Sequence, residues 1–206
     1  MNPLATRGGT VIAGIVLSLI FIFVYGNNGA GNPVEWTIWF HVVVGIAWIG
    51  LLYYFNAIQM PAVAAAVADE GGPGAAGINK YIAPRALFWF RWAALLTWLS
   101  GLSAIAQKYG PGLEGGGMEA IINAFTLSGG LHIIGVGAIL GTIMLINVWM
   151  IIWPNQRRIL GLNPEASSPE VIAGAKVKAT MASRVNTMLS IPMLLSMTAA
   201  GHGLPF

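Results

Sequence analysis

The sequence predicts an all-α integral membrane protein, a bundle of five transmembrane helices, and two observations carry this prediction. Hydrophobic residues make up 56 % of the 206 residues and charged residues only 8 %, with a mean hydropathy of +0.73. A soluble domain of this size needs more charges to cover its surface. The apolar residues also form continuous blocks of helical length, whereas a membrane β-barrel has short alternating segments.

Five apolar blocks predict the spans, at residues 9–25, 36–67, 86–106, 130–153 and 179–200. Each block is long enough to cross about 30 Å of hydrocarbon as a helix. The fourth span begins near Gly130 or as early as Met118, and Pro192 predicts a kink in the fifth. Glycine-rich segments at 71–77 and 110–117 are typical of loops between spans. No repeat or second domain is visible, so residues 1–206 are expected to form one transmembrane domain.

The first block has two interpretations, a cleaved signal peptide or a retained helix. Arg7 precedes the block and small residues follow it, as in a signal peptide. However, the apolar core is about 16 residues long and no A-x-A-like site precedes Asn32. A retained first span is therefore favoured.

The basic residues fall in alternate connections, which predicts the orientation by the positive-inside rule. Lys108 alone is expected on the opposite side from the others, which are Arg7, Lys80, Arg85, Arg91, Arg157, Arg158, Lys176, Lys178 and Arg184. The amino terminus should therefore be cytoplasmic and the carboxyl terminus periplasmic, in a multi-pass protein of the bacterial inner membrane. The net charge of +3 follows from this bias and calls for no nucleic-acid partner.

The chain has no cysteine, which excludes disulfides, iron–sulfur clusters, thiolate metal sites and covalently attached c-type haem. The sequence also lacks a P-loop, a dinucleotide-binding glycine motif and a Gly-x-Ser-x-Gly nucleophile motif in a strand-to-helix context. Any haem must be bound without a covalent link.

The three histidines, His41, His132 and His202, are expected at the same end of three separate spans. Each lies about 21 to 24 residues from the opposite boundary of its span, roughly 30–35 Å at 1.5 Å per residue. A membrane haem takes axial ligands from facing helices. We therefore predict haem b, ligated by His41 and His132, with His202 able to replace either. Copper is the alternative for the same imidazoles, and each histidine could instead be a polar anchor or helix contact.

Small and aromatic residues accompany these histidines. Gly45 and Trp48 share the helix face of His41, and Gly135 lies one turn from His132. A glycine one turn from a ligand lets a flat macrocycle approach, but it equally allows close helix packing. We expect these three residues to line the cofactor site.

A second polar layer is predicted near the cytoplasmic side of the membrane. Its members are Asn56, Gln59, Arg91, Asn147, Arg184 and Asn186. Polar groups in hydrocarbon cost a few kcal/mol unless paired, so these should turn inward and hydrogen-bond one another. A static polar clamp is the favoured interpretation, and the alternatives are a quinone or small-molecule site or a proton route.

Several motifs resemble the membrane domain of bacterial urate hydroxylase, the urate oxidase amino-terminal domain family. They are residues 39–56 (WFHVVVGIAWIGLLYYFN) with Gln59-Met-Pro61, residues 91–101 (RWAALLTWLSG), residues 147–156 (NVWMIIWPNQ), and residues 183–192 (SRVNTMLSIP) leading to His202. The histidine and glycine pattern of the second span is also loosely similar to membrane haem and copper families.

The resemblance implies a membrane protein that passes electrons between a small reductant and the respiratory chain. Family members carry a cytochrome c domain after the membrane part, whereas this sequence ends at Phe206 without a cysteine. We therefore expect a haem b electron-transfer protein, either an oxidoreductase itself or the cytochrome subunit of a larger complex, whose acceptor is a separate cytochrome c or quinone. The alternative class is a non-catalytic accessory subunit of a larger membrane complex.

Overall fold

The computed structural model describes residues 2–26, 31–163 and 167–205, and in these residues it contains helices and no strands. The long helices, with the short ones that continue them, follow the apolar blocks of the sequence. They are α1 (Arg7–Tyr25), α2 (Pro33–Tyr54), α3 (Met60–Ala68), α4 (Ala83–Tyr109), α5 (Gly116–Phe125), α6 (His132–Ile146), α7 (Trp153–Ile159) and α8 (Pro169–His202). A 3₁₀ turn, η1 (Pro3–Ala5), precedes α1.

Three π-helical turns interrupt or precede these helices. They are η2 (Phe55–Gln59) between α2 and α3, η3 (Ile78–Ile82) before α4, and η4 (Asn147–Ile152) between α6 and α7. Each is followed by a proline at the second position of the next helix, Pro61, Pro84 and Pro154 respectively. Proline lacks an N–H and its ring clashes with the carbonyl four residues earlier. The wider π turn separates these groups, so the helix continues past the proline.

The chain divides into two compact units, Met1–Pro33 and Val34–Phe206. The first contains η1 and α1, and the Thr6 hydroxyl oxygen caps α1 by accepting from the Gly9 N–H at 3.1 Å. The second contains the other helices and all three histidines. The expectation of a single domain stays a prediction.

Three of the described helices are long and apolar enough to cross a membrane: Arg7–Tyr25, Pro33–Ala68 and His132–Ile159. These correspond to the first, second and fourth predicted spans, and the fourth begins at His132 because residues 116–125 form the separate helix α5. The third and fifth blocks form helices of 27 and 34 residues, α4 and α8. Their length suffices for a span, but both carry more polar residues. The membrane class is therefore supported, while five crossings stay a prediction.

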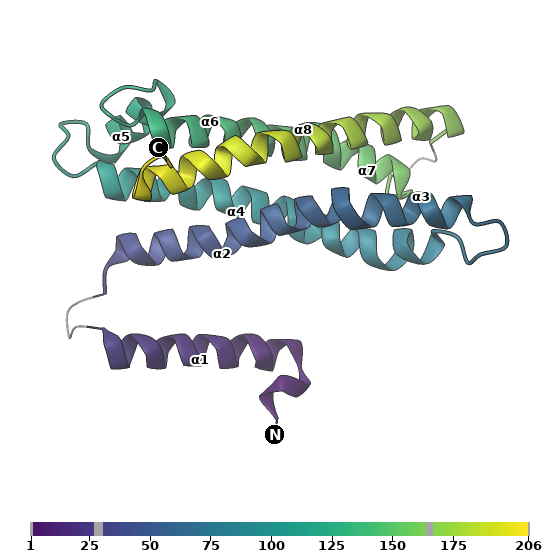
Figure 1. Ribbon diagram of the computed structural model, residues 1–206, viewed down its shortest axis with the longest axis horizontal. Helices are drawn as coiled ribbons and strands as arrows, with labels where there is room; N and C mark the ends of the chain where they lie inside the picture. The colour runs from purple at the N-terminus through teal and green to yellow at the C-terminus, as the bar shows by residue number, and fades with distance from the viewer. Residues whose placement is uncertain (1, 27–30, 164–166, 206) are drawn as a thin grey trace. The chain divides into compact units, whose positions relative to one another are not determined.

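In the second unit, α2, α4, α6 and α8 run side by side along the long axis (Figure 1). The beginnings of α2 and α6 lie at the same end as the carboxyl end of α8, which we call the histidine end. The beginnings of α4 and α8 and the end of α7 lie at the opposite end, which we call the basic end because it carries the two basic connections of this unit. The sequence predicted both groupings.

Large apolar side chains from three of the helices form the main core. Trp48 and Leu52 of α2, Phe90 of α4, and Met144 of α6 are each at most 2 % exposed. The rings of Phe55 and Phe90 meet edge to face with centroids 5.3 Å apart. This core lies between the histidine end and the basic end, so it fixes the helix positions at both.

Candidate functional site

His41 is held against α4 by its Nδ1 atom. Nδ1 lies 2.8 Å from the carbonyl oxygen of Thr97 and 3.2 Å from Oγ of Ser100. The carbonyl can only accept, so Nδ1 must carry the proton of the neutral ring. Nε2 therefore has the free lone pair, which is the arrangement found when a histidine ligates a metal through Nε2.

A glycine on α4 makes this placement possible. A Cβ atom added at Gly101 would lie 2.9 Å from Cε1 and 3.2 Å from Nδ1 of His41, closer than such atoms normally approach. The imidazole therefore lies directly against the α4 backbone. We call Thr97, Ser100 and Gly101 the histidine socket; the sequence analysis did not identify it, because the contacts join residues 56 and more positions apart.

Gly45 and Trp48, on α2 with His41, take part in helix packing. A Cβ at Gly45 would be in ordinary contact, 3.7 Å, with the Thr97 methyl group, so Gly45 also faces α4. Trp48 is 2 % exposed, and its Nε1 has no hydrogen-bond partner in the described part of the chain. The expectation that Gly45 and Trp48 line a cofactor site stays a prediction.

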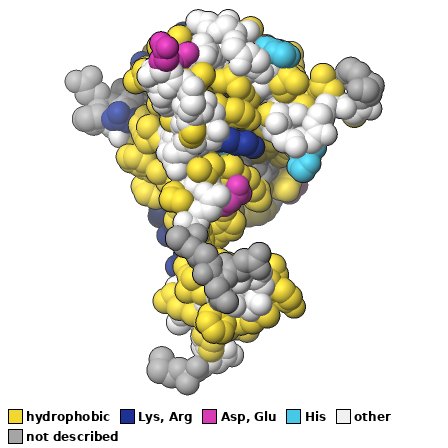
Figure 2. Space-filling view, turned by 90° about the vertical axis from the view of Figure 1, so that its left-hand side faces the viewer, with side chains coloured by type: hydrophobic (Ala, Val, Ile, Leu, Met, Phe, Trp, Pro, Cys, Tyr) yellow, Lys and Arg dark blue, Asp and Glu magenta, His cyan; other side chains and the backbone are white. Residues whose placement is uncertain are grey.

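His132 and His202 lie at the same end but are exposed. His132 is the first residue of α6 and His202 the last of α8. Figure 2, which looks onto this end, shows histidine side chains at separate places on the surface. Among the described residues, no three His, Cys, Asp or Glu side chains are grouped so that they could hold a metal ion. The pairing of His41 with His132 or His202 stays a prediction.

Gly135 has a structural reason of its own. A Cβ there would lie 2.1 Å from the carbonyl oxygen of Ala124 and 2.8 Å from a Leu127 methyl group. The close approach of the α5 end to α6 therefore requires glycine. This contact accounts for Gly135 by helix packing, the alternative that the sequence left open.

The inner polar layer is partly assembled around two buried asparagines. Asn147 Nδ2 donates to Asn186 Oδ1 at 2.8 Å and to the Ala182 carbonyl at 2.9 Å. Asn186 Nδ2 donates in turn to the Met144 carbonyl at 3.0 Å. Asn186 is fully buried and Asn147 is 8 % exposed. We call this pair the asparagine clamp. Its hydrogen bonds join α6 and η4 to α8.

A second set of hydrogen bonds joins α2 and η2 to α8. Asn56 Nδ2 donates to Ser183 Oγ at 2.8 Å, and the hydroxyl groups of Tyr53 and Ser190 are 2.9 Å apart. Ser183 and Ser190 are buried. Sequence reasoning did not list these serines, because serine is common in helices whether or not it pairs; the spacing of Ser183, Asn186 and Ser190 along one helix face was the usable signal.

The remaining predicted members differ in their surroundings. Asn56 Oδ1, Gln59 Oε1 and Arg91 Nε are buried without a hydrogen-bond partner in the described part of the chain. The Arg91 guanidinium carbon lies 3.7 Å from the Trp153 ring centroid, a cation–π contact. Arg184 is exposed, so its side chain does not join the buried hydrogen bonds described above.

Comparison with known proteins gives one family. Residues 118–206 match the family described as urate oxidase N-terminal. The match confirms the resemblance over α5 to α8 and includes the asparagine clamp, His132 and His202. The motifs at residues 39–61 and 91–101, with His41 and its socket, lie outside the matched residues. No curated protein and no solved structure matches the chain.

Proposed function

We propose that the protein is a membrane-bound electron-transfer protein related to the urate oxidase N-terminal family, that it binds haem b, and that His41 supplies an axial ligand. The observation that carries the proposal is the hydrogen bond from His41 Nδ1 to the Thr97 carbonyl. It fixes the tautomer and ring orientation and leaves Nε2 free, as in ligating histidines. The family match supports the relation to the urate oxidase N-terminal family.

The residues fit one axial position better than two. His41 is partly buried and oriented by its socket, whereas His132 and His202 are exposed at helix ends. A haem bound through His41 would supply one-electron chemistry. The protein's own part would be to hold the ring and exclude water with the apolar faces of α2 and α4. His132 or His202 would complete the coordination, and a separate cytochrome or quinone would accept the electron.

Absorption spectra of the purified protein test this proposal. The reduced and oxidised wild-type protein should show a Soret band, and His41→Ala should remove most of it. His132→Ala and His202→Ala serve as matched variants, and the one that also loses haem identifies the second ligand. A Soret band that His41→Ala leaves unchanged, or a wild-type protein without haem, would refute the proposal. In the latter case metal analysis of the same sample would test copper.

We also propose five membrane crossings in a bacterial inner membrane, with the basic end cytoplasmic. The basic connections meet at one end of the second unit and Lys108 lies at the other, as the positive-inside rule requires. Because the chain has no cysteine, single introduced cysteines are unambiguous probes. Glu114→Cys, at the histidine end, should react with a membrane-impermeant maleimide in intact cells whose outer membrane is permeabilised. Glu70→Cys, at the basic end, should react only after lysis, and the reverse pattern would overturn the orientation.

A further inference from the structure

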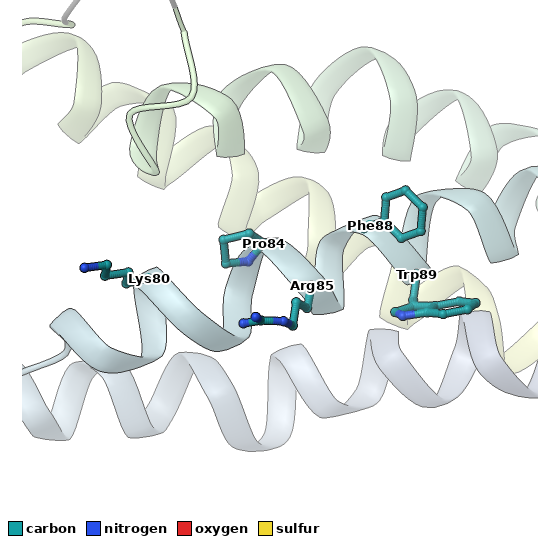
Figure 3. A pocket seen from close by; sticks show the side chains of 5 residues that line it. All are labelled: Lys80, Pro84, Arg85, Phe88 and Trp89. Atoms are coloured by element: carbon teal, nitrogen blue, oxygen red, sulfur yellow. The ribbon is translucent and has the colours of Figure 1, made fainter. Parts of the chain in front are cut away.

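A pocket at the basic end combines two cations with aromatic side chains on one continuous helix. It is lined by Lys80 of η3 and by Pro84, Arg85, Phe88 and Trp89 of α4, and its volume is about 400 Å³. Figure 3 shows Arg85 and Trp89 projecting from the same side of this helix, with Lys80 toward its beginning. Pro84 and Phe88 are four residues apart, as are Arg85 and Trp89, so each pair lies along one line of the helix, and the two lines are neighbours.

The two cations of this pocket lack a carboxylate partner among the described residues. Lys80 lies 5.3 Å from the Tyr81 ring centroid, and Arg85 Nη1 donates to the Tyr81 carbonyl at 2.5 Å. No carboxylate pairs with either cation in the described part of the chain. A guanidinium has five N–H donors, so Arg85 keeps most of its donors for a ligand.

A third cation adjoins the pocket from the next turn. The Arg91 guanidinium carbon lies 5.7 Å from the centroid of the Phe88 ring, which lines the pocket. The Nε of Arg91 is buried without a hydrogen-bond partner in the described residues. Arg91 therefore adds a positive charge beside one lining residue of the pocket.

The order of side chains along the helix indicates an amphiphile as the ligand. Lys80 and Arg85 are nearest the helix beginning, and Phe88 and Trp89 follow one turn toward its middle. Phe88 is 47 % exposed and Trp89 65 % exposed, which is typical of aromatic rings at a membrane interface. Beyond Arg91, α4 continues with the apolar residues 92–96. A ligand that matches this order has an anionic group at one end and a hydrocarbon chain at the other.

We propose that the Lys80–Trp89 pocket binds the phosphate headgroup of an anionic phospholipid, with the acyl chain lying along α4. Clusters of basic residues at the cytoplasmic membrane surface attract such lipids by about 1 kcal/mol per cation, which corresponds to roughly a fivefold affinity difference per cation. The inference does not depend on haem binding, since the pocket is at the opposite end from His41.

Spin-labelled lipids test the proposal in the full-length protein. Wild-type protein is reconstituted in phosphatidylcholine vesicles that contain a trace of spin-labelled phosphatidylglycerol or, separately, spin-labelled phosphatidylcholine. The motionally restricted fraction of each label gives the selectivity. We expect several-fold preference for phosphatidylglycerol in the wild type and loss of most of it in K80Q/R85Q. The control K176Q/K178Q removes the same charge from exposed lysines of α8, outside the pocket, and should retain the preference.

Three outcomes would overturn the proposal. Unchanged selectivity in K80Q/R85Q would show that the pocket does not bind the lipid. An equal loss in both double variants would show a diffuse effect of surface charge. Release of the restricted phosphatidylglycerol by inorganic phosphate, but not by chloride at equal ionic strength, would assign the pocket to free phosphate instead. All four substituted side chains are exposed, so the variants should fold, and circular dichroism provides the check.

Discussion

Replacing Gly101 with alanine tests whether the histidine socket has the tight geometry described above. The new Cβ would lie 2.9 Å from Cε1 of His41, so the ring or the helix must move by several tenths of an ångström. The ring cannot move freely, because Nδ1 is hydrogen-bonded to Thr97 and Ser100. Overpacking of this kind costs about 1–3 kcal/mol, and a lost hydrogen bond adds about 0.5–1.5 kcal/mol.

An opposing effect must be separated from this cost. Alanine is better than glycine in a helix by up to about 1 kcal/mol. Gly50→Ala on α2 measures that gain alone, because a Cβ at Gly50 meets no atom within 4 Å. The free energy of unfolding of the two variants in mild detergent should therefore differ by about 2–4 kcal/mol, with Gly101→Ala the less stable.

A double-mutant cycle identifies the cause. If the clash is with the imidazole, Gly101→Ala should cost almost nothing in a His41→Ala background, because the cavity left by the ring accepts the methyl group. The coupling energy should then equal the single-variant cost. A Gly101→Ala variant as stable as Gly50→Ala, or a cost that persists without the His41 ring, would refute the reasoning.

Further predictions concern the contact of α6 and η4 with α8. Asn186→Ala should lower the free energy of unfolding by about 2 kcal/mol, because the buried Asn147 amide loses one of its two acceptors. Chemical unfolding in detergent measures this, and a change below about 0.5 kcal/mol would contradict the clamp. Gly137→Ala places a Cβ 2.9 Å from Ser196 Oγ, which is held in place by a hydrogen bond to the Ile133 carbonyl, and should lower the midpoint of thermal unfolding. Gly141→Ala on the same helix, where a Cβ meets nothing within 4 Å, should not; equal midpoints would contradict the close packing.

The helices could be predicted from the sequence because their boundaries depend on local composition. The predicted spans 9–25 and 36–67 correspond to helices Arg7–Tyr25 and Pro33–Ala68. The helix of the fifth predicted span, α8, begins ten residues earlier than predicted, at Pro169. Ser168 caps this helix by accepting from the Val171 N–H at 3.4 Å. A helix can begin with polar residues before it enters the hydrocarbon, and hydropathy alone does not detect such an extension.

The site could be predicted only in part, because side-chain partners depend on the relative rotation of helices. Hydrophobic patterning places His41 and Asn186 at suitable depths but does not show which neighbour each faces. His41 turns toward Thr97 of α4, and Gly135 packs on Ala124 of α5. From the sequence alone, Gly45 and Gly135 were each consistent with either a macrocycle or close helix packing. The atoms that surround each glycine in the structure show which neighbour it packs against.

The three π turns show how a local signal in the sequence controls the polar layer. Pro61, Pro84 and Pro154 each stand two residues after a π turn. Sequence reasoning considered only Pro192, which α8 accommodates without such a turn among its described residues. A π turn adds one residue to a helical turn, so it rotates the side chains on one side of it relative to those on the other.

This rotation has a consequence for the polar side chains of the layer. Asn56 lies within η2 and Asn147 begins η4, and both donate hydrogen bonds to residues of α8. A continuous α-helix with the same sequence would direct the residues after each turn to a different face by roughly 100°. The prolines therefore do more than interrupt two apolar helices. They maintain the widened turns that let asparagines face α8 while the following residues, including Arg157 and Arg158, reach the basic end.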